Sequence, residues 1–231
     1  AIKNFVKFVE ASHAREVFLG ILLGNQRFLE VLLSLFGSSN GLSNIIIRYP
    51  EYIDVITTNE TIYRFKHPDK LYTDLIQELQ KATTIKDKKK VLRQFKKEEE
   101  LRIGVRYLIR ETDLIGTLTD LSATADVFLR AAFETAKEEV QKEPIEASFS
   151  EVENFAIFGL GKLGGEELNF GSDLDIIFVY DEGKTTLANE NKLALTSKYM
   201  RLAQIIYALL TEMTSQGFVY KIDTNLRPDG N

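Results

Sequence analysis

The sequence contains no cysteine and only two histidines among its 231 residues. The absence of cysteine excludes disulfide bonds, thiolate metal ligands and a cysteine nucleophile. Long apolar runs are also missing: none approaches the ~20 residues that cross a bilayer. The first residues, AIKNFVKFVE, lack both the basic start and the long apolar middle of a signal peptide. We therefore expect a cytoplasmic protein that has no membrane partner.

Positive charge is not in excess either. The 34 acidic residues outnumber the 29 basic ones, and the net charge of -5 argues against nucleic acid as a partner. The hydrophobic content of 44% is ample for a packed core. Because the chain begins with Ala and ends with Gly-Asn directly after LRPD, we expect it to be a piece of a longer protein.

Amphipathic helices are predicted for the first two thirds of the chain, where apolar residues recur at helical spacing. One helix should end near Gly37, and another should end before Pro50, because the residue that precedes a proline avoids the α region. Arginines alternate with glutamates further along, at positions 93, 102, 106 and 110, which indicates surface ion pairs. Further helices are predicted over about 70–82, 86–110 and 113–141, after an irregular connection over 57–70.

The pattern changes at Pro144, after which short buried strands are predicted over 155–158, 174–180 and 218–224. A short helix is predicted over 165–169 and a long one over about 190–212. The sequence therefore predicts an α+β protein. It should have a helical bundle over residues 1–148 and a domain with a small mixed sheet over 149–231, truncated at its C-terminal end.

Two carboxylates interrupt the second predicted strand, in 155-FAIFGLGKLGGEELNFGSDLDIIFVY-180. Side chains alternate along a strand, so Asp173 and Asp175 should share one face while Leu174 and Ile176 point into the core. Repulsion between two such anions is relieved by cations. Because no His or Cys stands nearby, hard Mg²⁺ is the best candidate. Asp223, on the last predicted strand, is placed to be a third ligand.

The glycines that precede this strand admit several interpretations. Gly159-x-Gly161-x-x-Gly164 matches a dinucleotide-binding pattern, but the acid that such a site needs about 20 residues further on is not where the pattern requires it. A P-loop is disfavoured because Leu163, and not Ser or Thr, follows Lys162. The remaining interpretation is a turn whose backbone N–H groups hold triphosphate oxygens. Gly164 and Gly165 also fit a tight turn that allows close helix packing.

These residues carry a resemblance. The order of strand, Gly-rich turn, Asp-x-Asp strand, long helix and third-Asp strand resembles the polymerase-beta type nucleotidyltransferase superfamily. More narrowly, GLGKLGGEELNFGSDLDIIFVY and KIDTNLRPDG are similar to the glutamine synthetase adenylyltransferase family, as are RQFKKEEELRIGVRYLI and DLIGTLTDLSATAD upstream. The likeness covers nearly the whole chain.

The resemblance implies a bacterial enzyme that uses ATP and Mg²⁺ to transfer AMP to a tyrosine of glutamine synthetase when nitrogen is plentiful. It implies a helical bundle packed on a polymerase-beta-like domain, and it admits a nitrogen-regulatory signalling protein as a further partner. Asp173, Asp175 and Asp223 would be catalytic and metal-binding. The nucleotide would be bound by Gly161, Lys162, Gly164, Gly165, Ser172 and Arg227.

Alternatives remain at this point. The family is described as having two similar halves, one of which attaches AMP while the other removes it by phosphorolysis. The segment 15–54 resembles the stretch that precedes the attaching half, and this resemblance favours attachment. A module that senses a nucleotide without catalysis is a further alternative. The family usually has Arg where this chain has Asn225, which leaves Arg227 alone to provide positive charge on the last strand.

Overall fold

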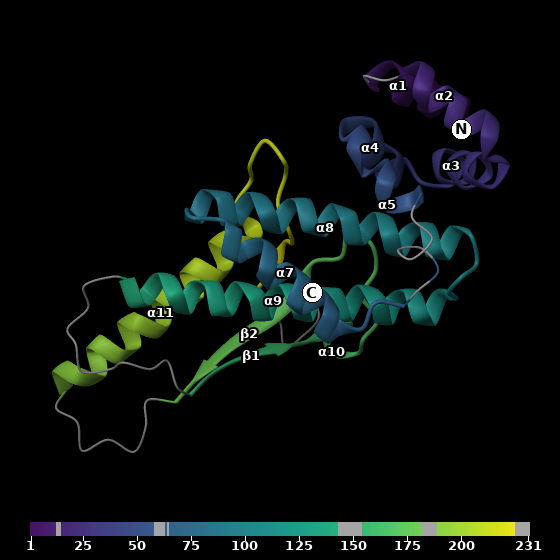
Figure 1. Cartoon of the computed structure of the whole chain (residues 1–231). Coiled ribbons are helices and arrows are strands. Elements are labelled where there is room, and N and C mark those ends of the chain that lie inside the picture. The colour runs from purple at the N-terminus through teal and green to yellow at the C-terminus, as the bar shows by residue number, and fades with distance from the viewer. Residues whose placement is uncertain (13–14, 58–62, 64, 143–153, 182–188, 225–231) are drawn as a thin grey trace. The chain divides into compact units, whose positions relative to one another are not determined.

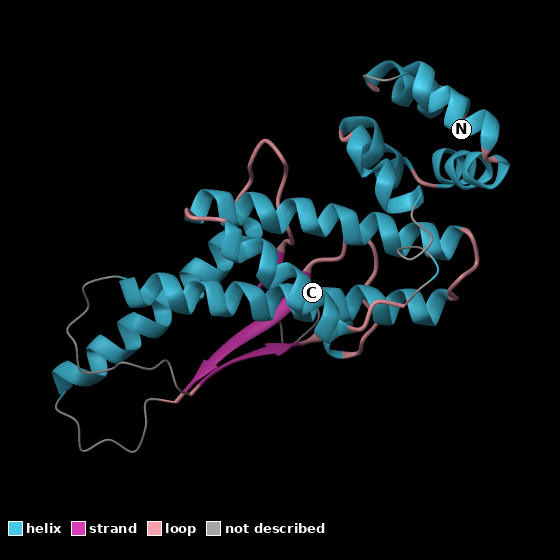
Figure 2. Ribbon diagram, viewed as in Figure 1, coloured by secondary structure: helices cyan, strands magenta, loops and turns pink. Residues whose placement is uncertain are grey.

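The structure is a computed structural model of the whole chain, and it describes residues 1–12, 15–57, 63, 65–142, 154–181 and 189–224 (Figure 1). Helices make up most of these residues, and the strands form a small three-stranded sheet (Figure 2). The predicted α+β class is therefore confirmed.

Contacts between residues divide the chain into two compact units. The first comprises Ala1–His67 and Phe95–Leu121, and the second comprises Pro68–Gln94 and Ser122–Asn231. The sheet thus shares its unit with helical residues that precede position 95. The predicted boundary between residues 148 and 149 lies outside the described residues, so the proposed division into a bundle and a sheet domain stays a prediction.

Short helices form most of the first unit. They are α1 (Ile2–Ala11), α2 (Arg15–Gly24), α3 (Gln26–Ser38), α4 (Asn40–Arg48), the 3-10 helix η1 (Pro50–Tyr52) and α5 (Ile53–Thr57). The side chain of Asn25 caps α3 by accepting the N–H of Phe28 at 3.0 Å, and Ser39 caps α4 in the same way. The predicted helix ends near Gly37 and before Pro50 are confirmed.

A single apolar core joins these helices. Phe8 of α1 meets Phe18 of α2 edge to face, with ring centroids 4.9 Å apart, and Leu32 and Leu35 of α3 are fully buried. Within the described residues no single helix is long and apolar enough to cross a membrane. The segments Phe18–Gly24 and Gln26–Ser38 are long and apolar enough only when taken together, and a bend of 112° separates them.

Four longer helices match the predicted ranges. They are α7 (Pro68–Lys81), α8 (Ile85–Leu108), α9 (Leu114–Lys142) and α11 (Asn189–Thr211). Thr84 precedes α8 and accepts the N–H of Asp87 at 3.1 Å, while its own hydroxyl bonds the Asp87 carboxylate. Asp113 precedes α9 and accepts the N–H of Gly116 at 2.8 Å. Both are capping interactions that satisfy N–H groups of a first helical turn.

The prediction that the arginines at positions 93, 102, 106 and 110 form surface ion pairs is wrong for the first three, which are buried in α8. Arg102 and Arg106 are buried, and Arg102 Nε donates to Glu99 at 2.7 Å inside the first unit. Arg93 belongs to the second unit and has no exposed surface. This burial lowers the pKa of its guanidinium. Regular alternation of charge along a sequence does not reveal which helix face is covered, because helices distant in the sequence provide the cover.

The sheet has the strand order β1-β2-β3, formed by β1 (Phe155–Gly159), β2 (Leu174–Tyr180) and β3 (Ile222–Asp223). β1 and β2 are antiparallel, whereas β2 and β3 are parallel, so the predicted mixed sheet is confirmed. Helices α9 and α11 cover one face. The ring of Phe155 stacks on Phe133 of α9 and on Tyr199 of α11, with centroids 5.7 and 5.9 Å apart.

Two predicted elements differ from the structure. The last strand, predicted over 218–224, is only Ile222–Asp223, because the N–H groups of Val219 and Tyr220 both donate to Leu210 at the end of α11. The short helix predicted over 165–169 instead occupies Gly161–Gly164, as α10. Glycine generally weakens a helix, but here tertiary contacts decide where the helix forms.

Candidate functional site

Asp175 and Asp223 lie side by side on neighbouring strands. The parallel register of β2 and β3 matches Leu174 with Ile222 and Asp175 with Asp223. Residues matched in this way project to the same face of a pleated sheet, so the two carboxylates share one face. Leu174 and Ile176 are buried on the opposite face, as the alternation of the sequence predicts.

Asp173 lies immediately before β2, with a side chain that is 54% exposed. The ammonium group of Lys221 is 3.9 Å from one of its oxygens, and the N–H of Leu174 donates to the carbonyl of Lys221 at 2.8 Å. In the part of the chain that the structure describes, no group of three His, Cys, Asp or Glu side chains is arranged to hold a metal ion. A site formed by all three aspartates therefore stays a prediction.

The paired carboxylates have the chemistry that Mg²⁺ prefers. Both provide hard oxygen ligands, and Asp175 is exposed, which leaves room for the water molecules that Mg²⁺ retains. The residues present thus fit a magnesium ion, with Asp175 and Asp223 as the ligands that the register brings together.

Gly161 packs directly against the Asp175 carboxylate. It adopts a φ of +53°, and a Cβ at this position would lie 2.5 Å from Asp175 Oδ2. The N–H of Leu160 also donates to the carbonyl of Asp175 at 2.8 Å. Gly161 of the glycine pattern and Asp175 of the acidic pair, separate in sequence, therefore lie against each other in the fold.

Substituting Gly161 by alanine should destabilise the second unit by about 2 kcal/mol, because alanine is strained at a positive φ and its methyl group displaces Asp175. Thermal or denaturant unfolding of the purified chain measures the loss. Gly165→Ala is the matched control, since its Cβ would make only ordinary contacts of 3.5 Å or more. Equal stability of the two variants would show that the close contact at Gly161 has no energetic role.

Helix α10 ends in a Schellman motif. Glu166 has a φ of +57° and donates its N–H to Leu163, while the N–H of Glu167 donates to Lys162 at 2.7 Å. A Cβ on Gly164 would lie 2.7 Å from the carbonyl oxygen of Gly159. Close packing of the backbone thus requires glycine at position 164, whichever ligand the turn binds.

The other predicted nucleotide-binding residues are placed as follows. Lys162 is exposed in α10, beside the N–H groups of the first turn, which have no partner within the helix itself. The hydroxyl of Ser172 accepts the N–H of Asn169 at 3.1 Å and so stabilises the loop before β2. Arg227 and Asn225 lie outside the described residues.

A second acidic pair near this turn was not expected from the sequence. The pKa of Asp126, on α9, is raised mainly by burial of its carboxyl group and to a smaller extent by the negative charge of Glu166. The residue as a whole nevertheless keeps an exposed surface. The helical spacing of α9 offers no signal for this pair, because only the fold brings Glu166 near enough to influence Asp126. Both carboxylates add negative charge beside the glycine turn.

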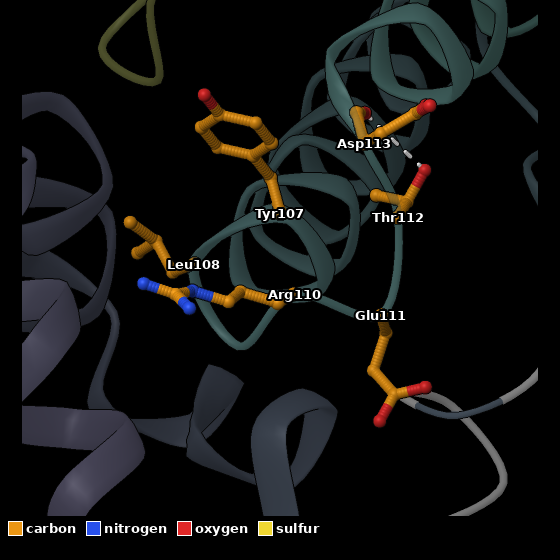
Figure 3. Close-up of a pocket in the computed structure, with 6 residues that line it drawn as sticks. All are labelled: Tyr107, Leu108, Arg110, Glu111, Thr112 and Asp113. Atoms are coloured by element: carbon orange, nitrogen blue, oxygen red, sulfur yellow. Dashed lines mark hydrogen bonds between the residues drawn. The ribbon is translucent and has the colours of Figure 1, made fainter.

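A hollow elsewhere in the chain does not belong to this site. It lies at the turn between α8 and α9, in the first unit, and Figure 3 shows the side chains that line it. Its volume is about 640 Å³. Asp113 and Thr112 are engaged within the turn, where the Thr112 hydroxyl lies 3.4 Å from the Asp113 carbonyl. Its lining residues are Tyr107, Leu108, Arg110, Glu111, Thr112 and Asp113.

The described structure defines an α+β protein whose small mixed sheet carries adjacent carboxylates beside a glycine turn. The chain belongs to the glutamate-ammonia ligase adenylyltransferase family, since the model of that family matches residues 29–231. The family resemblance predicted from the sequence is thereby confirmed.

Curated relatives are about 30% identical to this chain over the aligned residues, and those compared below are each named a bifunctional glutamine synthetase adenylyltransferase/adenylyl-removing enzyme. The relative from Chromobacterium violaceum is 31% identical over 231 residues, which is 100% of this chain and 24% of the relative. The relative from Hahella chejuensis is 29% identical over 236 residues, 99% of this chain and 24% of the relative. The chain therefore spans about a quarter of the length of these relatives.

Proposed function

We propose that this chain is the nucleotide-handling part of an enzyme that transfers AMP from ATP to a tyrosine hydroxyl of glutamine synthetase. The observation that carries the proposal is the register of Asp175 with Asp223 beside Gly161, in a member of this family. The names of the relatives include such an activity. We further propose that the sheet unit is a polymerase-beta-like nucleotidyltransferase domain.

The roles of the residues follow from their chemistry. Asp173, Asp175 and Asp223 would hold Mg²⁺, which when bound supplies positive charge to the triphosphate and stabilises the attacking and leaving oxygens. The exposed N–H groups at the start of α10 and the mobile charge of Lys162 would bind triphosphate oxygens. The remaining donors proposed for the nucleotide are Gly164, Gly165, Ser172 and Arg227.

The transfer exchanges one bond to phosphorus for another. The tyrosine oxygen attacks the α-phosphorus, a new O–P bond forms, and the bond to the pyrophosphate leaving group breaks. The tyrosine proton must be removed, because a phenol with a pKa of about 10 is a weak nucleophile at neutral pH. We assign proton removal to the carboxylate of Asp223, as an alternative to its role as a metal ligand, and its register with Asp175 supports the assignment.

Substituting Asp223 by asparagine should lower the transfer rate by about 100-fold at saturating Mg²⁺ and flatten the acidic side of the pH-rate profile. Asparagine retains the shape of the side chain but does not accept the proton. The measurement is the initial rate of AMP incorporation into glutamine synthetase between about pH 5.5 and 9. An unchanged profile in the variant would remove Asp223 from this role.

The direction of the reaction is part of the proposal. We favour attachment of AMP, although the names of the relatives contain both attachment and removal. The full-length protein should be incubated with ATP and unmodified glutamine synthetase, and separately with phosphate and AMP-modified glutamine synthetase. Loss of the first reaction alone in an Asp175→Asn variant supports attachment. Loss of the second alone supports removal by phosphorolysis, and loss of neither supports a nucleotide-sensing module.

The proposed setting is the bacterial cytoplasm, with glutamine synthetase as the protein substrate and a nitrogen-regulatory signalling protein as a second partner. The net charge of -5 does not favour a nucleic acid partner. No membrane partner is proposed. Regulation by a signalling protein would be tested by adding the candidate protein to the transfer assay and measuring the change in rate.

A further inference from the structure

Ser122 connects helix α9 to the loop that leads into the candidate site. Its hydroxyl oxygen accepts the N–H of Leu168 at 3.1 Å. Both residues are almost completely buried, with Ser122 1% and Leu168 2% exposed. The bond joins positions 46 residues apart, so it fixes a tertiary arrangement and not a local turn.

The loop that it holds runs from the end of α10 to the start of β2. At its beginning, the N–H of Glu167 donates to Lys162 at 2.7 Å. Near its end, Asn169 and Ser172 bond each other, with the Ser172 N–H donating to the Asn169 carbonyl at 3.1 Å. These bonds shape the loop internally. The bond to Ser122 ties the middle of the loop to a long helix that also packs on the sheet.

We propose that Ser122 is a positioning residue for the carboxylates of the candidate site. The inference rests on the proposed AMP transfer and extends it to a residue that touches neither substrate nor metal. Asp173 follows Leu168 after only four intervening residues and is itself exposed, so its placement depends on the backbone that precedes it. Catalytic groups need support from residues that fix their position to a fraction of an ångström.

Removing the hydroxyl leaves the buried N–H of Leu168 without its acceptor. A buried donor that loses its partner is unfavourable, and the loop can relieve this by moving toward water. Movement of the loop would carry Asp173 and the start of β2 away from Asp223. The substitution should therefore impair the chemical step more than it impairs the binding of ATP.

The test compares Ser122→Ala with the wild type in the full-length protein. We expect kcat for AMP incorporation to fall by about 10-fold and KM for ATP to change by less than about 2-fold. The concentration of Mg²⁺ that gives half-maximal rate should rise. The amide of Leu168 should exchange with solvent at least about 10-fold faster, because its protecting bond is gone.

Thr135→Val provides the matched control. It removes a buried hydroxyl from the same helix, away from the loop, and should leave kcat and the magnesium dependence unchanged. If Ser122→Ala does not fold, Ser122→Cys serves instead, since a thiol keeps the size of the side chain and is a weak acceptor. A partial loss of kcat is expected for that variant.

Failure of this inference is distinguishable from failure of the proposed function. Suppose that the Ser122 variant keeps the wild-type kcat and magnesium dependence while an Asp175→Asn variant, assayed in parallel, is inactive. This result would overturn the positioning role alone. Equal losses in the Ser122 and Thr135 variants would also overturn it, because they would indicate a general effect of helix α9. Full activity of Asp175→Asn would overturn the proposed site itself.

Discussion

Substituting Asp175 by asparagine is expected to lower the rate of AMP transfer by about 1000-fold or more while leaving the chain folded. Asparagine has nearly the same size, and the position is exposed, so packing should not change. The substitution removes one of the two negative charges that the strand register places together. Stabilisation of a phosphoryl transfer by a correctly held metal ion contributes several kcal/mol, which corresponds to a factor of this size.

The measurement is the initial rate of AMP incorporation by the full-length protein, with circular dichroism to verify folding. Asp181→Asn is the matched control, because Asp181 is an exposed aspartate that follows β2 at its opposite end. Its rate should stay within about 2-fold of the wild type, as surface substitutions away from a site have small effects. A fully active Asp175→Asn protein would contradict the assignment of this carboxylate.

Substituting Arg93 by methionine is expected to destabilise the second unit by about 3 kcal/mol. The guanidinium has no exposed surface and donates to the carbonyls of Gly217 and Lys89, each at 2.7 Å, and to that of Glu212. Methionine fills similar space but donates no hydrogen bond, so each of these carbonyls loses its bond to the guanidinium, although that of Gly217 keeps its bonds from Thr214. The loss should appear as a fall in melting temperature of about 6 to 12 °C.

Lys89→Met tests whether the effect belongs to the buried hydrogen bonds or to charge in general. Lys89 bonds the exposed carboxylate of Glu212, an interaction that should contribute less than about 1 kcal/mol. Because Arg93 holds the end of α11 and the turn at Gly217 together, Arg93→Met should also loosen the chain that continues to Asp223. A melting temperature unchanged by Arg93→Met would refute this role.

Much of the fold follows from the sequence because apolar periodicity reports directly on buried faces. The strand Leu174–Tyr180 and the long helices were predicted within a few residues of their observed ends. Alternation led us to expect Asp173 and Asp175 on one face, with Asp223 as a third ligand, but the register that aligns Asp175 with Asp223 could not be predicted. Register depends on the crossover helix α11 and on contacts between distant segments.

The differences arise where tertiary contacts override local pattern. The sequence suggested a helix after the glycines, but Gly159 and Gly164 approach so closely that the helix forms at the glycines themselves. A strand was expected from Phe218, yet the backbone there bonds to Leu210 of α11. Neither effect has a signal in residue type alone, because glycine and aromatic residues serve several conformations.

Residues that support the site were the hardest to predict. Ser122 and Arg93 act through atoms that are distant in the sequence, and each looks ordinary in its own helix. Alternating charges around Arg93 even suggested solvent exposure, whereas the side chain is fully buried. The glycine and aspartate motifs were found because the chemistry of phosphate and metal binding restricts residue types at fixed spacing. Supporting contacts have no such restriction.

The most direct test of the central claim is a crystal structure of the full-length protein soaked with Mn²⁺ and a non-hydrolysable ATP analogue. The anomalous signal of manganese locates the metal independently of the protein model. We predict a peak about 2.1 Å from carboxylate oxygens of Asp175 and Asp223, with the triphosphate against the turn at Gly161. A nucleotide bound away from this turn, or a metal ion that contacts neither aspartate, would contradict the account.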